Sequence, residues 1–130
     1  MAAGTASKRL DEEVVVWLST VDPAGTPQPT PVWFLWTGSE VLIFSQPRTA
    51  KLRNLRGNPR ASVHLNSTPR GGGIVVLTGV AEIAEPSTEE LAAYDEKYAS
   101  HIEGLGMPAK DFHASYSVPI RLRPEKTRGF

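Results

Sequence analysis

Residues 45–56, Ser45-Gln-Pro-Arg-Thr-Ala-Lys-Leu-Arg-Asn-Leu-Arg56, follow directly after the apolar run VLIF and carry several basic side chains. The run is typical of a buried strand, and the spacing of Leu52 and Leu55 predicts a short helix with one inward stripe. The first turn of such a helix presents unpaired N–H groups and the positive end of its dipole. With Arg48 and Lys51 beside it, this turn is expected to bind a phosphate, although a solvated basic helix is the alternative interpretation.

Composition limits the classes of protein that the chain can belong to. With 130 residues, of which 40% are hydrophobic, we expect a single domain over residues 10–130 after a flexible N-terminus at residues 1–9. The 14 basic and 14 acidic side chains balance, so no overall field attracts nucleic acid. Neither a secretory leader nor a membrane span is expected, and the absence of cysteine fits a cytoplasmic protein without disulfides.

The rest of the chain predicts a mainly β protein with tight turns. Strands are expected at Val14–Ser19, Pro31–Trp36, Val41–Ser45, Arg60–Asn66, Ile74–Ala84 and Ser115–Arg123. Gly79 marks a bulge in the fifth of these strands, and Pro124 is expected to end the last one. A capping box formed by Ser87 and Glu90 predicts a longer helix over Glu89–Ile102.

The strand Pro31–Trp36 is apolar on both faces. Alternation places Trp33 and Leu35 on one side, with Val32, Phe34 and Trp36 on the other. A small barrel needs only one apolar face, so a partner subunit or a flat cofactor is expected to cover the second. The alternative is that the helix over Glu89–Ile102 covers it.

No residue pattern predicts protein-based catalysis or a metal site. His64 faces a polar strand side, where it either donates a proton or satisfies a backbone carbonyl. His101 and His113 have no carboxylate at the spacing typical of metal ligands. Neither a Ser-His-Asp nor a Cys-His arrangement is present, so we predict no catalytic side chain and no metal.

Five segments in order resemble one known family. They are Asp22-Pro-Ala-Gly-Thr-Pro-Gln28, Pro31-Val-Trp-Phe-Leu-Trp36, Phe44-Ser-Gln-Pro47, Ala50-Lys-Leu-Arg-Asn-Leu55 and Asn58-Pro-Arg-Ala-Ser-Val-His64. Over about residues 10–123 the chain resembles the pyridoxamine 5′-phosphate oxidase-like split-barrel superfamily. Within it, the chain is most similar to the actinobacterial flavin/deazaflavin oxidoreductase branch, many of whose members bind coenzyme F420.

The resemblance implies a fold, an assembly and a set of site residues. It implies a mainly β, six-stranded antiparallel split β-barrel (FMN-binding split barrel) with two or three short helices, forming a homodimer with cofactor sites between subunits. The cofactor ring is expected beside Pro31, Val32, Trp33 and Phe34, and its phosphate and tail at Ser45, Gln46, Pro47, Arg48, Thr49 and Lys51. Arg70, in a glycine-rich loop, is expected to come from the second subunit.

The implied activity is hydride transfer between F420 and a small organic acceptor. FMN is the alternative cofactor, because both molecules present a flat ring and a phosphate. Arg53, Arg56 and Arg60 favour F420, whose tail carries further carboxylates. Two alternatives stay open: an FMN-dependent enzyme of the pyridoxamine 5′-phosphate oxidase type, and a non-enzymatic protein that binds a flavin, deazaflavin or haem.

Overall fold

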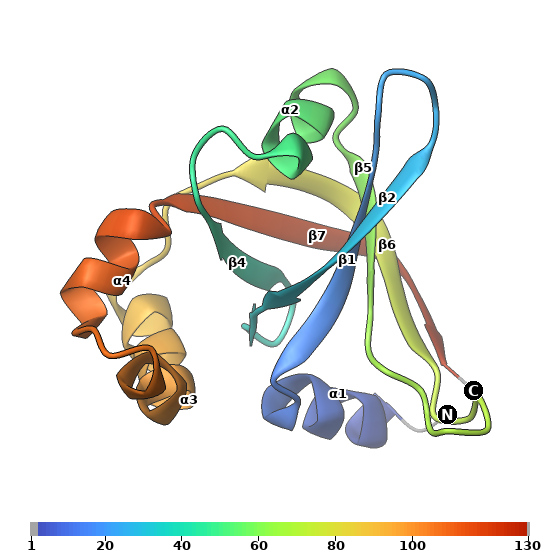
Figure 1. Cartoon of the computed structure of the whole chain (residues 1–130). Helices are drawn as coiled ribbons and strands as arrows, with labels where there is room; N and C mark the ends of the chain where they lie inside the picture. The colour runs from blue at the N-terminus through green and yellow to red at the C-terminus, as the bar shows by residue number, and fades with distance from the viewer. Residues whose placement is uncertain (1–2, 130) are drawn as a thin grey trace.

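The computed structural model describes residues 3–129 of the chain, which fold into a curled antiparallel sheet of seven strands with four helices (Figure 1). The elements are α1 (Ala3–Glu12), β1 (Val15–Val21), β2 (Pro27–Trp33), β3 (Leu35–Trp36), β4 (Val41–Ser45), α2 (Ala50–Gly57), β5 (Arg60–His64), β6 (Val75–Ile83), α3 (Thr88–Gly104), α4 (Ala109–Ser115) and β7 (Val118–Gly129). The strand order is β2-β1-β5-β6-β7-β4-β3. The predicted mainly β split barrel is therefore confirmed.

The sheet has seven strands where six were predicted, because Phe34 interrupts the second one. The backbone N–H of Phe34 donates to the Tyr98 hydroxyl at 2.8 Å, and its carbonyl accepts from Lys97 at 2.9 Å. These bonds take the place of pairing with a neighbouring strand, so the chain leaves the sheet for one residue. It then re-enters as β3, which pairs with β4 instead of β1.

The helices differ from the prediction in number and in extent. The segment expected to be flexible, residues 1–9, falls partly in α1, where Ala6 and Leu10 are buried in the core. Residues 1–2 lie outside the described part of the chain. The expected turn after Pro108 is the helix α4, which continues to Ser115. Four helices are therefore present where two or three were expected.

The last strand does not end at Pro124. In the register, Gly79 of β6 lies opposite Pro124 of β7, at the site of a register shift between Thr78 and Gly79. The predicted bulge at Gly79 is confirmed. A Cβ atom at position 79 would lie 2.0 Å from the Arg123 carbonyl oxygen, so only glycine fits there. Because the shift accommodates the proline, β7 runs on to Gly129.

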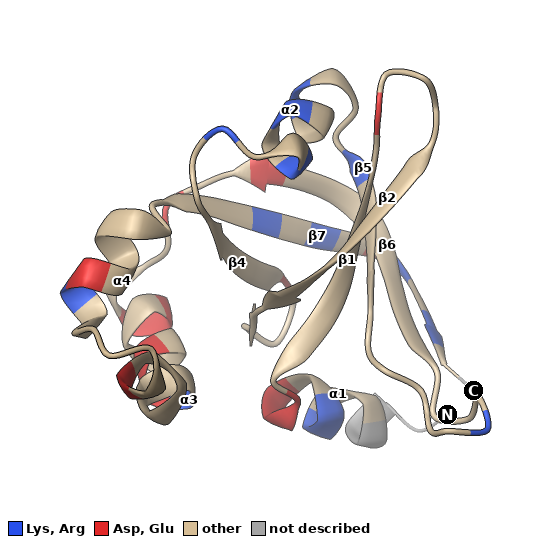
Figure 2. Ribbon diagram, viewed as in Figure 1, with Lys and Arg blue, Asp and Glu red and all other residues tan. Residues whose placement is uncertain are grey.

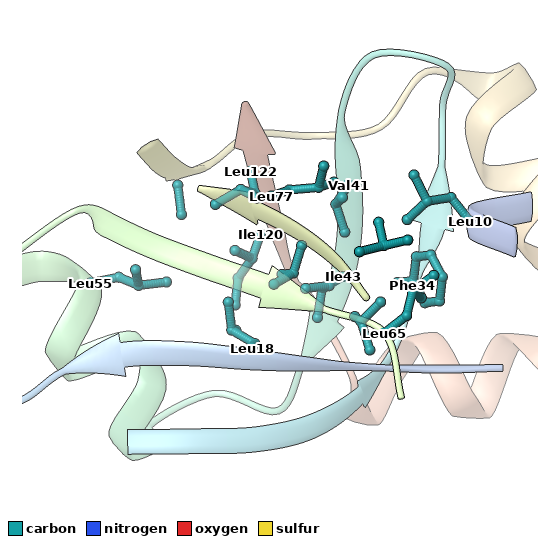
Figure 3. Packing of buried hydrophobic residues seen from close by; sticks show 14 of the residues in the cluster. Leu10, Leu18, Phe34, Val41, Ile43, Leu55, Leu65, Leu77, Ile120 and Leu122 are labelled. Atoms are coloured by element: carbon teal, nitrogen blue, oxygen red, sulfur yellow. The ribbon is translucent and has the colours of Figure 1, made fainter. Parts of the chain in front are cut away.

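The core lies inside the curled sheet and is closed at both ends by helices. Figure 3 shows Leu18, Leu77, Ile43 and Ile120 packed together, with Leu10 of α1 and Leu55 of α2 at the two ends of the cluster. Each strand supplies alternate side chains to this cluster, which is the pattern expected of a sheet with one inward face. Burial of these side chains is the main source of stability for the barrel.

A second cluster lies on the other face of the sheet, beneath α3 and α4. Its buried members include Leu35, Leu42, Tyr98 and Phe112, and Trp33 packs against it. The predicted alternation over residues 32–36 is thus confirmed, since Val32, Phe34 and Trp36 belong to the first cluster. The helix that the sequence offered as an alternative cover is what packs on this face.

The helix α3 is fixed at its start by the predicted capping box. The Ser87 hydroxyl accepts from the Glu90 N–H at 3.0 Å, and the Glu90 carboxylate accepts from the Ser87 N–H at 2.9 Å. Arg121 of β7 donates to the carboxylates of Glu90 and Glu40, which joins α3, the β3–β4 turn and β7. Within residues 3–129, no helix is long and apolar enough to cross a membrane.

Candidate functional site

A pocket of about 380 Å³ lies between the barrel and the α3–α4 pair, and we call it the main pocket. Its lining residues are Val15, Pro31, Val32, Trp33, Phe44, Ser45, Gln46, Thr49, Lys51, Tyr94, Leu105, Phe112 and Tyr116. The non-aromatic polar side chains come from the end of β4, the segment after it and the first turn of α2. The aromatic groups come from β2, β4, α3, α4 and the residue after α4. The pocket therefore has a polar side and an aromatic side.

The polar side is built where β4 gives way to α2. The Ser45 hydroxyl donates to the Gln46 carbonyl at 2.8 Å and lies 3.1 Å from the Thr49 hydroxyl. Thr49 is the N-cap residue of α2, but its side chain makes no capping hydrogen bond to the helix. The first turn of α2 is thus left without a side-chain cap at the edge of the pocket, where an anion would be favoured.

Lys51 supplies a cation on this side of the pocket. Its side chain is half-buried, and burial lowers the pKa of its ammonium group below the ordinary value. Within the described residues no ion pair joins Lys51 to a carboxylate. Figure 2 shows that Lys and Arg gather on α2 and the loop before it, whereas α3 carries mainly acidic residues. A partly desolvated lysine without an anionic partner is suited to an anionic ligand.

The aromatic side is a continuous stack of four rings. Trp33 lies between Tyr98 and Phe112, with centroid distances of 4.8 Å and 5.6 Å and interplanar angles of 8° and 20°. Tyr116 continues the stack from Phe112 at 4.7 Å and 18°. Such packing fixes the ring planes and leaves Trp33, Phe112 and Tyr116 as walls of the pocket. A flat conjugated molecule matches walls of this kind.

Seven of the eleven residues predicted to bind a cofactor line the main pocket. They are Pro31, Val32, Trp33, Ser45, Gln46, Thr49 and Lys51. The structure brings together residues from β2 and from the β4–α2 junction that are distant in sequence. This arrangement is compatible with the predicted ring and phosphate positions.

Four predicted residues lie elsewhere. Phe34 is fully buried in the barrel core. Pro47 and Arg48 line a second hollow with Leu52, Leu55 and Val118. Arg70 is exposed in the β5–β6 loop, at the end of the barrel opposite α2 (Figure 1). These positions separate the four residues from the main pocket within one chain.

The predicted group of arginines for a cofactor tail is only partly present. Arg53 donates to the Arg48 carbonyl at 2.8 Å, and Arg56 lines the second hollow. Arg60 instead pairs with Glu125 of β7 at 2.6 Å. Arg60 is the first residue of β5 and lines neither the main pocket nor the second hollow, so the expected position near the phosphate-binding turn is not observed.

The histidines have structural neighbours. A ring nitrogen of His64 lies 3.1 Å from the Leu65 carbonyl, as in the structural alternative offered by the sequence. His113 lies 2.6 Å from the Asp95 carboxylate, between α4 and α3, and His101 packs edge-on against Trp33. Over residues 3–129, no group of three or more His, Asp or Glu side chains is arranged to hold a metal ion.

Several lining residues were not predicted as site residues. Tyr94 belongs to the helix that the sequence offered as a cover for the sheet, Phe112 lies where only a turn was expected, and Phe44 belongs to an apolar strand. Tyr94 does share the i, i+4 spacing of Tyr98 and Ile102, which predicts an inward stripe. That spacing indicates burial but does not show which buried ring borders a cavity.

Comparison with known proteins connects this geometry to a family. The family model described as pyridoxamine 5′-phosphate oxidase matches residues 4–129. A comparison with curated proteins gives no match.

Solved structures with the same fold bear different functional descriptions. A putative pyridoxamine 5′-phosphate oxidase from Listeria innocua superposes with a TM-score of 0.73 at 22% identity, covering 96% of this chain and 94% of that one. An F420 reductase gives 0.70 at 23%, covering 94% of each chain. The haem storage protein HutZ from Vibrio cholerae gives 0.71 at 19%, covering 95% and 90%. At these identities the likeness concerns the fold, and together with the family model it shows that the chain belongs to the pyridoxamine 5′-phosphate oxidase family.

Proposed function

We propose that the chain is an oxidoreductase that binds F420 in the main pocket and transfers a hydride between this cofactor and a small organic acceptor. The half-buried Lys51, which has no carboxylate partner in the described part of the chain, is the observation on which the proposal depends. An ammonium group that is partly desolvated gains most from a ligand anion. The cofactor, when bound, supplies the hydride chemistry.

In this proposal each side of the main pocket binds a different part of the cofactor. The aromatic walls at Trp33, Phe112 and Tyr116 hold the flat ring, beside the backbone of Pro31 and Val32. Lys51 and the uncapped start of α2 hold the phosphate. The protein then acts by orienting the ring and excluding water from one side of it.

The proposal includes a homodimer. Pro47, Arg48 and Arg70 do not reach the main pocket within one chain, so their predicted roles require a longer tail path or a second subunit. Arg70 is proposed to come from the second copy. Sedimentation of the purified protein tests whether it is a dimer. If an Arg70→Ala variant binds the cofactor as tightly as the wild type does, Arg70 is not part of the site.

Titration with cofactor tests the function. We expect micromolar binding of F420, weaker binding of FMN, and a loss of about 2 kcal/mol in affinity for Lys51→Ala, which is roughly thirtyfold. Lys126→Ala removes the same charge from an exposed position on β7 and serves as the control. Tighter binding of FMN than of F420 would favour an FMN-dependent enzyme of the oxidase type. If Lys51→Ala binds F420 and FMN as tightly as the wild type does, the proposal is contradicted.

Binding without catalysis is the second candidate function. A solved structure of similar fold is a haem storage protein, and His101 lies edge-on to Trp33, with ring centroids 5.7 Å apart, at the border of the aromatic stack. A haem titration followed by absorbance, with His101→Ala as the variant, distinguishes this candidate. Haem binding that depends on His101, without turnover of enone acceptors in the presence of reduced F420, would favour it.

A further inference from the structure

Tyr94 is a buried tyrosine that borders the main pocket. It projects from α3, is 1% exposed and is held on two sides by other rings. Phe44 meets it edge-on at 4.7 Å, and Tyr98 lies at 4.8 Å. This packing fixes the direction of its hydroxyl group, because the ring has no room to change its rotamer.

The Tyr94 hydroxyl has no hydrogen-bond partner among the described residues, whereas that of Tyr98 bonds to Phe34 and Val14. Fully enclosed side-chain oxygen and nitrogen atoms in the described part of the chain all have partners. The oxygen of Tyr94 is therefore not fully enclosed, and the pocket that the Tyr94 side chain lines is the main pocket. A hydroxyl that borders a pocket and has no hydrogen-bond partner within the protein is free to bond to a ligand there.

The chemistry of this hydroxyl favours a donor role. Burial raises the pKa of Tyr94 above its ordinary value, so the phenol keeps its proton across the physiological range. On the polar side of the pocket, the Ser45 and Thr49 hydroxyls are already bonded to each other or to backbone. Tyr94 thus presents an unused O–H donor next to the aromatic walls.

We propose that the Tyr94 hydroxyl donates a hydrogen bond to a carbonyl-type oxygen of a flat conjugated ligand, and so makes the main pocket selective for oxygenated rings. The inference rests on the proposed function in one respect, namely that the pocket takes a flat ring. The oxygen belongs either to the ring of the cofactor or to the acceptor. Both sources use the same O–H donor, and the experiment separates them.

The test uses ligands that lack a phosphate, so that Lys51 does not contribute to binding. Lumichrome is a tricyclic ring with two carbonyl groups, and phenazine is a tricyclic ring without oxygen. Calorimetric titration of the full chain is expected to show that Tyr94→Phe weakens lumichrome binding roughly five- to tenfold and leaves phenazine binding unchanged. Cyclohex-2-enone, titrated by NMR, represents the acceptor. A selective loss of enone binding would assign the oxygen to the acceptor instead.

Stability measurements separate this role from a structural one. Tyr94→Phe removes no hydrogen bond within the described chain, so its thermal midpoint is expected to equal or exceed that of the wild type. Tyr98→Phe, which removes a bonded hydroxyl from the same helix, is expected to lower the midpoint.

Two results would overturn the inference. One is unchanged binding of both lumichrome and cyclohex-2-enone by Tyr94→Phe, and the other is binding of neither ligand by the wild type. Failure of the proposed function gives a different result: the wild type then binds neither F420 nor FMN. The lumichrome titrations do not measure this.

Discussion

The Tyr98 hydroxyl accepts a hydrogen bond from the backbone N–H of Phe34 at 2.8 Å, at the one-residue break between β2 and β3. The same oxygen lies 2.7 Å from the Val14 carbonyl and 2.9 Å from the Phe34 carbonyl, either of which accepts its proton. A single side chain of α3 thereby satisfies backbone groups that the sheet leaves unpaired. Because Trp33 precedes the break and stacks on the Tyr98 ring, the contact also sets the aromatic wall of the main pocket.

Tyr98→Phe is expected to lower the free energy of unfolding by about 1–3 kcal/mol, because it leaves the buried Phe34 N–H without an acceptor. Denaturant unfolding of the variant beside the wild type measures this loss. Tyr94→Phe is the matched comparison, since it deletes a hydroxyl without a bonded partner in the described chain. Equal losses in both variants would show that the bond to Phe34 contributes nothing specific.

Gly79→Ala is expected to destabilise the protein by at least about 3 kcal/mol, because a Cβ atom would lie 2.0 Å from the Arg123 carbonyl oxygen. The neighbouring atoms are backbone of β7, so the clash is relieved only by moving the strand. Gly57→Ala, at the end of α2, is the control: its Cβ meets nothing within 4 Å, and we expect a change within about 0.5 kcal/mol. Thermal unfolding of both variants compares them directly, and similar midpoints would refute the close approach.

Glu90 is expected to make stability depend on pH under acidic conditions. Its bonds to Arg121 and to the Ser87 N–H lower the pKa of its carboxyl group from 4.5 to about 2. A depressed carboxyl pKa stabilises the folded state above the unfolded value of 4.5, and this contribution disappears as the pH falls toward 2.

Glu90→Gln is expected to cost about 2 kcal/mol at pH 7 and to flatten the acid limb of the stability profile. Unfolding measured from pH 7 down to pH 2 tests both effects. Glu89→Gln, on an exposed neighbouring position of α3, is the control. An unchanged slope in Glu90→Gln would mean that other carboxyl groups cause the acid sensitivity.

Local sequence rules predicted the elements whose causes are local. Alternation placed Phe34 and Leu35 on opposite faces of the strand, and the capping box at Ser87 predicted the start of α3. Rules of this kind failed where a distant residue decides the outcome. Pro124 does not end β7, because the shift at Gly79 of another strand accommodates it.

The predicted residues that line the main pocket come from residues 31–33 and 45–51, whereas those on α3 and α4 were not predicted. The apolar strand and the basic helix after it predicted the residues at the β4–α2 junction. That Lys51 lines the main pocket while Arg48 lines the second hollow depends on the turn between them. Arg48 has a positive φ of 64°, which sequence rules do not predict for arginine. The stack of Trp33 on Phe112 joins residues about eighty positions apart, so no periodicity in the sequence encodes it.

Lys51 is expected to show opposite effects on stability and on binding. Since burial lowers the pKa of its amine, the charged form is disfavoured in the folded state, and this penalty is present at neutral pH and is relieved as the pH rises. Lys51→Met keeps the apolar stem and removes the charge. Without ligand, its free energy of unfolding is therefore expected to equal or slightly exceed that of the wild type.

With F420 added at one hundred times the wild-type Kd, the order reverses. The wild type gains about 2.7 kcal/mol from ligand binding, whereas a thirtyfold weaker variant gains about 0.9 kcal/mol. Thermal unfolding with and without ligand measures both quantities in one experiment. Lys126→Met, exposed on β7, should gain as much as the wild type. If Lys51→Met gains the full amount as well, the phosphate does not bind at the start of α2, and the anion site must lie elsewhere on the protein.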